Sequence, residues 1–128
     1  MLNQVVLIGR LTRDPELRYL ESGKPVANFT LAVERPFVNK DGINDVDFIP
    51  VVVWDKLAEL CCKHLGKGRL VAVSGRLQIR KSKKDDRSYI NPEIVAAEVR
   101  FLDWPKENNQ EEELLNEILE EGDIKMTF

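Results

Sequence analysis

One stretch, VDFIPVVVWDKLAELCCKHL at residues 46–65, constrains the fold more than any other part of the chain. Its first half is rich in Val, Ile and Phe, which favours a β-strand. Side chains alternate along a strand, so one face carries Phe48, Pro50, Val52 and Trp54, and the other carries Ile49, Val51 and Val53. The sequence therefore predicts a strand that presents two large aromatic side chains on one face.

A single helix is predicted directly after this strand. Asp55 stands where an N-cap is expected, and Gly66 and Gly68 follow as C-terminal signals. The apolar residues with helical spacing are Leu57, Leu60, Cys61 and Leu65. The adjacent thiols of Cys61 and Cys62 diverge on a helix, so no disulfide is expected between them. With His64 as the only histidine, we read this group as helix packing and predict no metal site.

Four further strands are predicted, at residues 3–13, about 26–35, 69–80 and roughly 89–102. Residues 12–25 read as a turn-rich connection, and NKDGIN at 39–44 reads as a hairpin turn beyond Pro36. Pro92 predicts an edge position or a bulge in the last strand. In the first strand, Val6 and Ile8 make the second face apolar, which requires a cover from a loop or from another subunit.

Five strands with one helix between the third and the fourth are typical of an all-β, five-stranded Greek-key OB-fold barrel. A generic β-sandwich is the alternative, but it does not explain the lone helix. We assign the barrel to residues 1–104, which carry 17 Lys and Arg against 14 Asp and Glu. Residues 105–128 form a short acidic tail with 2 Lys and Arg against 8 Asp and Glu, so the whole chain has a net charge of −3. A basic body suits a polyanion, although an ordinary charged surface explains the charge equally well.

Aromatic and basic residues together point to nucleic acid. Phe37, Phe48 and Trp54 offer rings on which bases stack without regard to sequence, at roughly 1–3 kcal/mol per base. The outward row of the fourth strand is cationic and leads into a basic hairpin, with Arg76, Arg80, Lys81, Lys83, Lys84 and Arg87. Burial in the core is the alternative for Phe48 and Trp54. The β-branched residues on the opposite face already supply a core, which favours exposure of the two rings.

Four long stretches of the chain are MLNQVVLIGRLTRDPELRY at 1–19, GKPVANFTLAVERPF at 23–37, DFIPVVVWDKLAE at 47–59 and KGRLVAVSGRLQIR at 67–80. Through these stretches, residues 1–104 closely resemble the bacterial single-stranded DNA-binding protein family, of the type found in Gram-positive bacteria. It implies an OB-fold, a homotetramer, and sequence-independent binding of single-stranded DNA in replication, recombination and repair. The stacking aromatics of the family fall on Phe37, Phe48 and Trp54, and its backbone contacts fall on Lys56, Lys67, Arg80 and Lys81. We add Arg10, Arg35, Arg76, Lys84 and Tyr89 to the candidate DNA-binding residues.

The chain departs from this family at two places. The family usually has another stacking aromatic just after the basic end of the fourth strand, where this chain has Ser82, and Tyr89 across the turn is a partial substitute. The family also carries a long flexible linker and an acidic tip that recruits partner enzymes. Here EEELLNEILEEG reads as a short amphipathic helix, and the tip retains Asp123, Ile124, Met126 and Phe128 as candidate partner-binding residues. A frayed tail without a partner is the equal alternative.

Other functional classes are less well supported. The main alternative is an OB-fold adaptor that acts through protein contacts in a primosomal, DNA-uptake, phage or plasmid setting. An enzyme is not expected, because the chain has no Gly-rich phosphate loop and no nucleophile constellation around its one histidine. No cofactor is predicted. The absence of a long apolar run and of a signal peptide predicts a cytoplasmic, nucleoid-associated protein that does not enter membranes.

Overall fold

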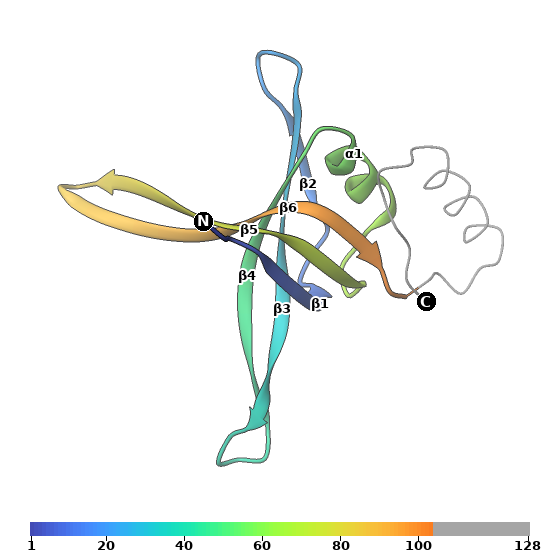
Figure 1. The fold of residues 1–128 in the computed structure, drawn as a ribbon, viewed down its shortest axis with the longest axis vertical. Coiled ribbons are helices and arrows are strands. Elements are labelled where there is room, and N and C mark those ends of the chain that lie inside the picture. The colour runs from blue at the N-terminus through green and yellow to red at the C-terminus, as the bar shows by residue number, and fades with distance from the viewer. Residues whose placement is uncertain (104–128) are drawn as a thin grey trace.

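The computed structural model describes residues 1–103 as six strands and one helix (Figure 1). The elements are β1 (Val5–Leu11), β2 (Glu16–Tyr19), β3 (Pro25–Val38), β4 (Asn44–Trp54), α1 (Asp55–His64), β5 (Leu70–Lys84) and β6 (Arg87–Phe101). In this part of the chain, no helix has the length and apolar character that crossing a membrane requires. The predicted acidic tail and its amphipathic helix lie outside the described residues.

Five of the strands close into a barrel. The strand order is β1-β5-β6-β4-β3-β2, and an additional pairing of β1 with β3 closes the ring. All neighbours are antiparallel except β4 and β6, which pair in parallel at Val51–Ile94 and Val52–Val95. The closure uses the pairs Arg10–Ala32 and Leu11–Leu31. This closed five-stranded barrel, with a single helix between β4 and β5, confirms the predicted OB-like fold.

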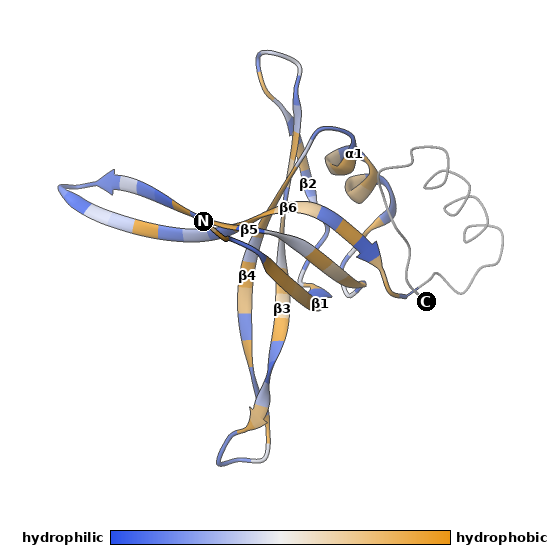
Figure 2. Cartoon of the chain, in the orientation of Figure 1, coloured by the Kyte–Doolittle hydropathy of each residue, from blue (hydrophilic) through white to orange (hydrophobic). Residues whose placement is uncertain are grey.

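Apolar side chains from every barrel strand fill the interior. Phe29 and Leu31 of β3 point inward as their alternation predicts, and Val71 and Val73 of β5 meet them in the core. Figure 2 shows the corresponding alternation of apolar and polar residues along the strands. The helix α1 adds its buried face, which consists of Ala58, Leu60 and Cys61. Burial of these groups is the main force that holds the barrel together.

The strand β2 was not predicted, because residues 12–25 read as a connection. Its four residues are all exposed, so they show no alternation of burial that would mark a strand. Pairing with β3, from Glu16–Asn28 to Tyr19–Pro25, is what makes this segment a strand. The sheet therefore extends one strand beyond the closed barrel.

The predicted N-cap at Asp55 is wrong. Trp54 occupies the cap position and no side chain caps the helix. Asp55 is instead the first residue of α1 and has a φ of 60°, a left-handed conformation that aspartate tolerates better than most residues. This residue turns the chain directly from β4 into α1, and its carboxylate lies 3.9 Å from Nζ of Lys24 and makes no hydrogen bond that caps the helix.

Two hairpins extend well beyond the barrel as arms, formed by β3–β4 and by β5–β6 (Figure 1). The strand β3 continues to Val38, three residues beyond the predicted end near residue 35, and its register with β4 becomes irregular between Glu34 and Val38, around Pro36. In the β5–β6 arm the apolar row of β5 leaves the core, so Leu77 and Ile79 are exposed. Pro92 pairs with Ile79 within this arm. The pairing of β6 with β4 lies at Ile94 and Val95, so Pro92 lies on an edge of the sheet, as predicted.

Candidate nucleic-acid interface

The outer face of β4 presents the two predicted aromatics in one row. The register pairs Ala32 with Phe48 and Val26 with Trp54, which places both rings on the same face of the β3–β4 ribbon. Phe48 is 66% exposed and Trp54 is half-buried. Six residues of strand separate them, which corresponds to roughly 20 Å. The predicted exposure of this row is confirmed for Phe48, whereas Val52 between the rings is buried.

A shallow pocket of about 140 Å³ lies on the β3–β4 ribbon, at the β4 positions between Phe48 and Trp54. Its wall on the ribbon is made by residues 28–30 of β3 and residues 50–52 of β4, and the rest is lined by Arg13, Asp14, Glu16 and Glu93. The polar residues of this lining were not among the predicted site residues. Side-chain alternation along β3 places Asn28 and Thr30 on its outer face, but only the fold brings Arg13 and Glu93 beside them.

Phe37 is the most exposed of the predicted aromatics, at 78%. It lies in the irregular part of the β3–β4 arm, close to the turn that Asn39 organises. The Asn39 side-chain oxygen accepts hydrogen bonds from the backbone N–H groups of Asp41 and Ile43, at 2.9 and 3.1 Å. This turn holds the arm in shape and leaves the Phe37 ring without a cover from the described residues.

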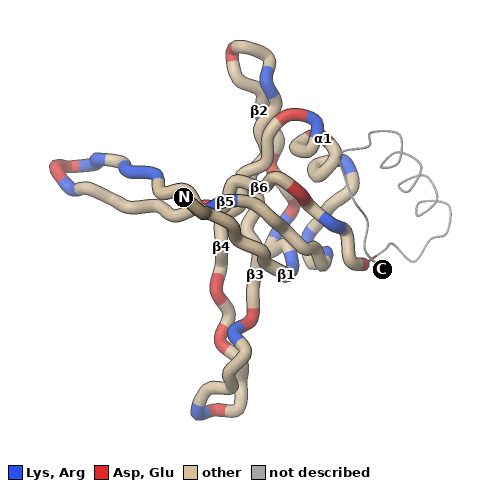
Figure 3. Tube along the Cα trace, viewed as in Figure 1, with Lys and Arg blue, Asp and Glu red and all other residues tan. Residues whose placement is uncertain are grey.

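The cationic arm is the β5–β6 hairpin, with the exposed residues Arg80, Lys81, Lys83, Lys84 and Arg87. Its tight turn is made by Asp85 and Asp86, both with positive φ angles of 54° and 62°. Figure 3 shows the positive residues along this arm, the negative pair at its tip, and mixed charges on the β3–β4 arm. The positive potential is therefore concentrated on one of the two arms.

Ser82 and Tyr89 face each other across the cationic arm. Their Cα atoms are register partners, so the two side chains lie on the same face. Tyr89 is 45% exposed. The Ser82 hydroxyl accepts a hydrogen bond of 3.3 Å from the side-chain amide of Asn91. The cationic arm thus carries an aromatic ring on β6, at Tyr89, directly opposite Ser82 of β5.

Several predicted cations already have carboxylate partners. Glu93 accepts hydrogen bonds from Arg80, at 2.6 Å, and from Gln78, at 2.9 Å. Arg35 donates two hydrogen bonds to Asp47, of 2.9 and 3.0 Å, and this bidentate contact holds the pKa of the Asp47 carboxyl below its usual value. These pairs fix the guanidinium groups in place and reduce the charge that they offer to a ligand.

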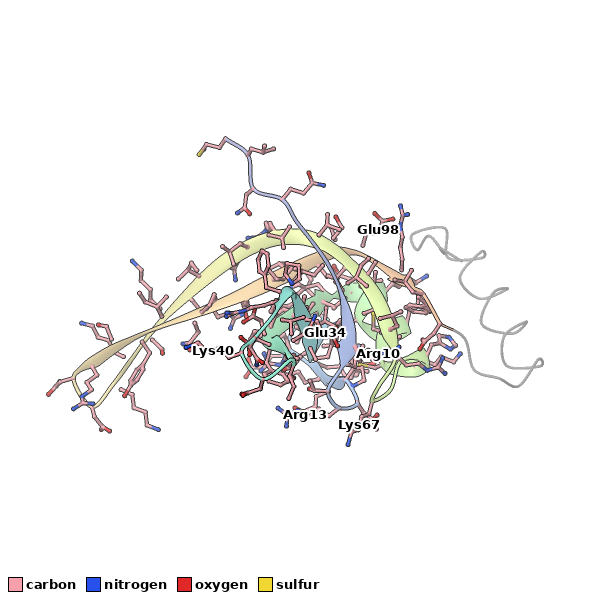
Figure 4. All side chains as sticks on the ribbon, turned by 90° about the horizontal axis from the view of Figure 1, so that it is seen from below. Arg10, Arg13, Glu34, Lys40, Lys67 and Glu98 are labelled. Carbon is pink, nitrogen blue, oxygen red and sulfur yellow. The ribbon has the colours of Figure 1, made fainter. Side chains whose placement is uncertain are left out.

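The remaining predicted cations are spread over the barrel. Arg76 donates to Gln78 at 3.0 Å, and Lys56 lies exposed in the first turn of α1. Arg10 donates to the Gly68 carbonyl at 2.9 Å and forms an ion pair with Asp103 at 3.5 Å, and the backbone N–H of Lys67 donates to the Asp14 side chain. Figure 4 shows Arg10 and Lys67 together with Arg13 on one side of the barrel. They form a second group of cations, apart from the cationic arm, and the carboxylates of Asp14 and Asp103 offset part of its charge.

The chemistry of the cysteines does not suit a metal or redox site. Cys61 is buried, and this burial strongly raises the pKa of its thiol. Burial also raises the pKa of the Cys62 thiol. Both effects disfavour the thiolate, which is the form that binds metals and attacks disulfides. The two residues pack α1, as the sequence predicts.

Comparison with known proteins identifies the family of the chain. Residues 2–102 match the single-strand binding protein family. Single-stranded DNA-binding protein 2 of Clostridium acetobutylicum is 50% identical over 113 residues, which cover 86% of this chain and 84% of that protein. A single-stranded DNA-binding protein of Staphylococcus aureus is 45% identical over 123 residues, which cover 94% and 78% of the two chains. The chain therefore belongs to the single-strand binding protein family.

Proposed function

We propose that this protein binds single-stranded DNA without regard to sequence and protects it during DNA replication, recombination and repair. The observation that carries this proposal is the row of Phe48 and Trp54 on the outer face of β4. Each base has a π-face, so stacking is sequence-tolerant and contributes roughly 1–3 kcal/mol per base. Duplex DNA hides these faces, which makes the aromatic row selective for single strands. The names of the relatives from Clostridium and Staphylococcus agree with this function.

The phosphate backbone is proposed to follow the cationic arm toward the aromatic row. Lys81 and Lys84 are exposed there, and Tyr89 adds a third ring beside them. Each phosphate that a lysine or arginine neutralises releases a counterion, so affinity falls steeply as salt rises. The β3–β4 arm contributes Phe37 as a stacking ring. Its mixed charges make it the weaker of the two arms for phosphate.

A fluorescence titration tests this function. The chain has two tryptophans, so a Trp104→Phe background isolates Trp54. We expect oligo-dT to quench Trp54 strongly, duplex DNA of equal length to quench it little, and high salt to weaken the binding. Equal affinity for both DNAs, or no response of Trp54 to either, would contradict the proposal and favour the adaptor function.

We further propose that the protein forms a homotetramer through β1. Val6 and Ile8 on its outer face are 62% and 57% exposed. Beside them is a shallow depression of about 340 Å³ lined by Gln4, Val6, Ala72, Val73, Ser74, Glu98 and Arg100. Within the described part of the chain, β1 pairs with β3 only at its last two residues, so much of one backbone edge is available. A second copy would cover both the apolar face and this edge.

Sedimentation velocity tests the assembly. We expect Val6→Glu to shift the protein toward smaller species, because a carboxylate in the contact would lose its hydration. Val38→Glu is a matched control, since Val38 is equally exposed but lies on the β3–β4 arm. A Val6→Glu protein that sediments as the wild type does would exclude β1 as the contact.

The C-terminal tip is proposed to dock replication and repair proteins through Asp123, Ile124, Met126 and Phe128. The support is the sequence alone, an acidic segment that ends in apolar residues and an aromatic. Deleting residues 123–128 should abolish the capture of such proteins and leave the affinity for oligo-dT unchanged. Capture that survives the deletion would remove the docking role of the tip.

A further inference from the structure

The β2–β3 hairpin carries positive residues onto the face that holds Trp54. The register pairs Arg18 with Val26 and Val26 with Trp54, so these three residues form one row across neighbouring strands. Their side chains lie on the same face, with the Cα of Arg18 about 10 Å from that of Trp54. Among residues 1–103, no hydrogen bond or ion pair engages the Arg18 side chain. Arg18 therefore extends the face that holds Trp54 onto β2, a strand that was not predicted from the sequence.

Lys24 of the same hairpin lies over the Trp54 ring. Its Nζ atom is 5.4 Å from the ring centroid and 3.9 Å from Oδ2 of Asp55. The Lys24 and Asp55 side chains are 51% and 63% exposed. An exposed cation–π contact and an exposed ion pair are each weak, and salt screens the ion pair further. One face of the ring is therefore covered by a cation that is held only lightly.

A base and the Lys24 ammonium cannot occupy the same face of the ring. Stacking on that face requires the ammonium to move, which the long flexible lysine stem permits. The nucleotide that brings the base also brings a phosphate, which is a better partner for an ammonium than a ring or a distant carboxylate. The ammonium keeps its charge and exchanges its contacts with the ring and Asp55 for a contact with the phosphate.

We propose that Lys24 is an exchangeable cover for Trp54. In the free protein it lies over the ring beside Asp55, and on binding it yields the ring to a base and contacts the phosphate of that nucleotide. Arg18, in the same row, contacts a neighbouring phosphate. The inference rests on the proposed function and adds two DNA-contacting residues to it, neither of which was among the candidate residues.

The salt dependence of oligo-dT binding tests this assignment. We expect Lys24→Ala and Arg18→Ala each to make the plot of log Kd against log salt shallower by about 0.7, the loss of one phosphate contact on a single strand. Lys24→Arg should retain the wild-type slope. Lys63→Ala is the matched control, because it removes one positive charge from the last turn of α1 and should leave the slope unchanged.

A nuclear magnetic resonance experiment tests the exchange itself. The ε-methylene protons of Lys24 should show a ring-current shift in the free protein that Trp54→Leu removes, and oligo-dT should abolish the shift in the wild type. A shift that persists with DNA bound would overturn the exchange.

Two binding results would also overturn the role of Lys24. One is an unchanged salt slope for Lys24→Ala in a protein that binds oligo-dT. The other is tighter binding of that variant with an unchanged slope, which would make Lys24 an obstruction only. A wild-type protein that does not bind oligo-dT at all would instead overturn the proposed function.

Discussion

Replacing Phe48 with alanine separates binding from folding, because the ring is 66% exposed. A phenylalanine buries about 200 Å² when fully covered, so the covered third corresponds to roughly 70 Å². At about 25 cal/mol per Å² this area stabilises the fold by at most about 1.7 kcal/mol. We therefore expect Phe48→Ala to lower the free energy of unfolding by less than about 2 kcal/mol.

The same substitution should weaken DNA binding more strongly. A lost base stack costs about 1–3 kcal/mol, which corresponds to an increase in Kd of roughly fivefold to 150-fold. Because Phe48 is mostly exposed in the free protein, its truncation should change the stability of the free protein little and lower mainly the stability of the DNA complex. The Kd is measured by Trp54 quenching with oligo-dT, and the unfolding free energy by urea titration.

Phe29→Ala is the matched control on the neighbouring strand. Phe29 is 4% exposed and belongs to the core, so its truncation should destabilise the fold by about 3–5 kcal/mol. The reasoning is refuted if Phe48→Ala binds oligo-dT as tightly as the wild type does. It is also refuted if Phe48→Ala loses as much stability as Phe29→Ala, because Phe48 would then be a packing residue.

Three further predictions concern the arms and the barrel. Gly75→Ala should destabilise the fold by more than about 1 kcal/mol in a urea titration, since a Cβ there would meet the backbone of β6; full stability would show that the strand shifts freely. Ser82→Trp should lower the Kd for oligo-dT by adding a ring to the cationic arm, and an unchanged Kd would count against stacking there. The pKa of the Asp47 carboxyl should lie below its ordinary value of 3.8, because of its hydrogen bonds from Arg35. The stabilisation from this pair is therefore complete above the pKa of the unfolded chain and is lost as pH falls through the lower folded pKa. Carbon chemical shifts follow this titration, and Arg35→Ala should return the pKa toward 3.8.

The barrel was predictable because burial repeats along its strands with a period of two. Phe29 and Leu31 point inward as their alternation indicates, and the strand before the helix presents Phe48 outward. The assignment to the single-strand binding protein family followed from long ordered matches, and it agrees with the prediction that the chain is not an enzyme. These features are local in sequence, so a pattern within a few residues reveals them.

The features that the sequence did not reveal depend on distant partners. The strand β2 has no buried face and exists through its pairing with β3. Arg80 looked available for phosphate, yet Glu93 accepts its hydrogen bond from 13 positions away. Asp55 has the chemistry of an N-cap, but its positive φ serves a direct turn from strand to helix. The position of Lys24 over Trp54 likewise depends on the register of β3 with β4.

The way β1 enters the barrel has a consequence for how the chain folds. Its register with β5 joins Val5 to Gly75 and Arg10 to Leu70, so its main partner is synthesised long after it. The hairpins β3–β4 and β5–β6 bring together residues close in sequence, so closing their loops costs much less entropy than pairing β1 with β5. We therefore expect these hairpins to form early and the docking of β1 to limit the folding rate. During synthesis on the ribosome, the apolar strand β1 emerges first, and the edge that pairs with β5 stays unpaired until β5 has been made.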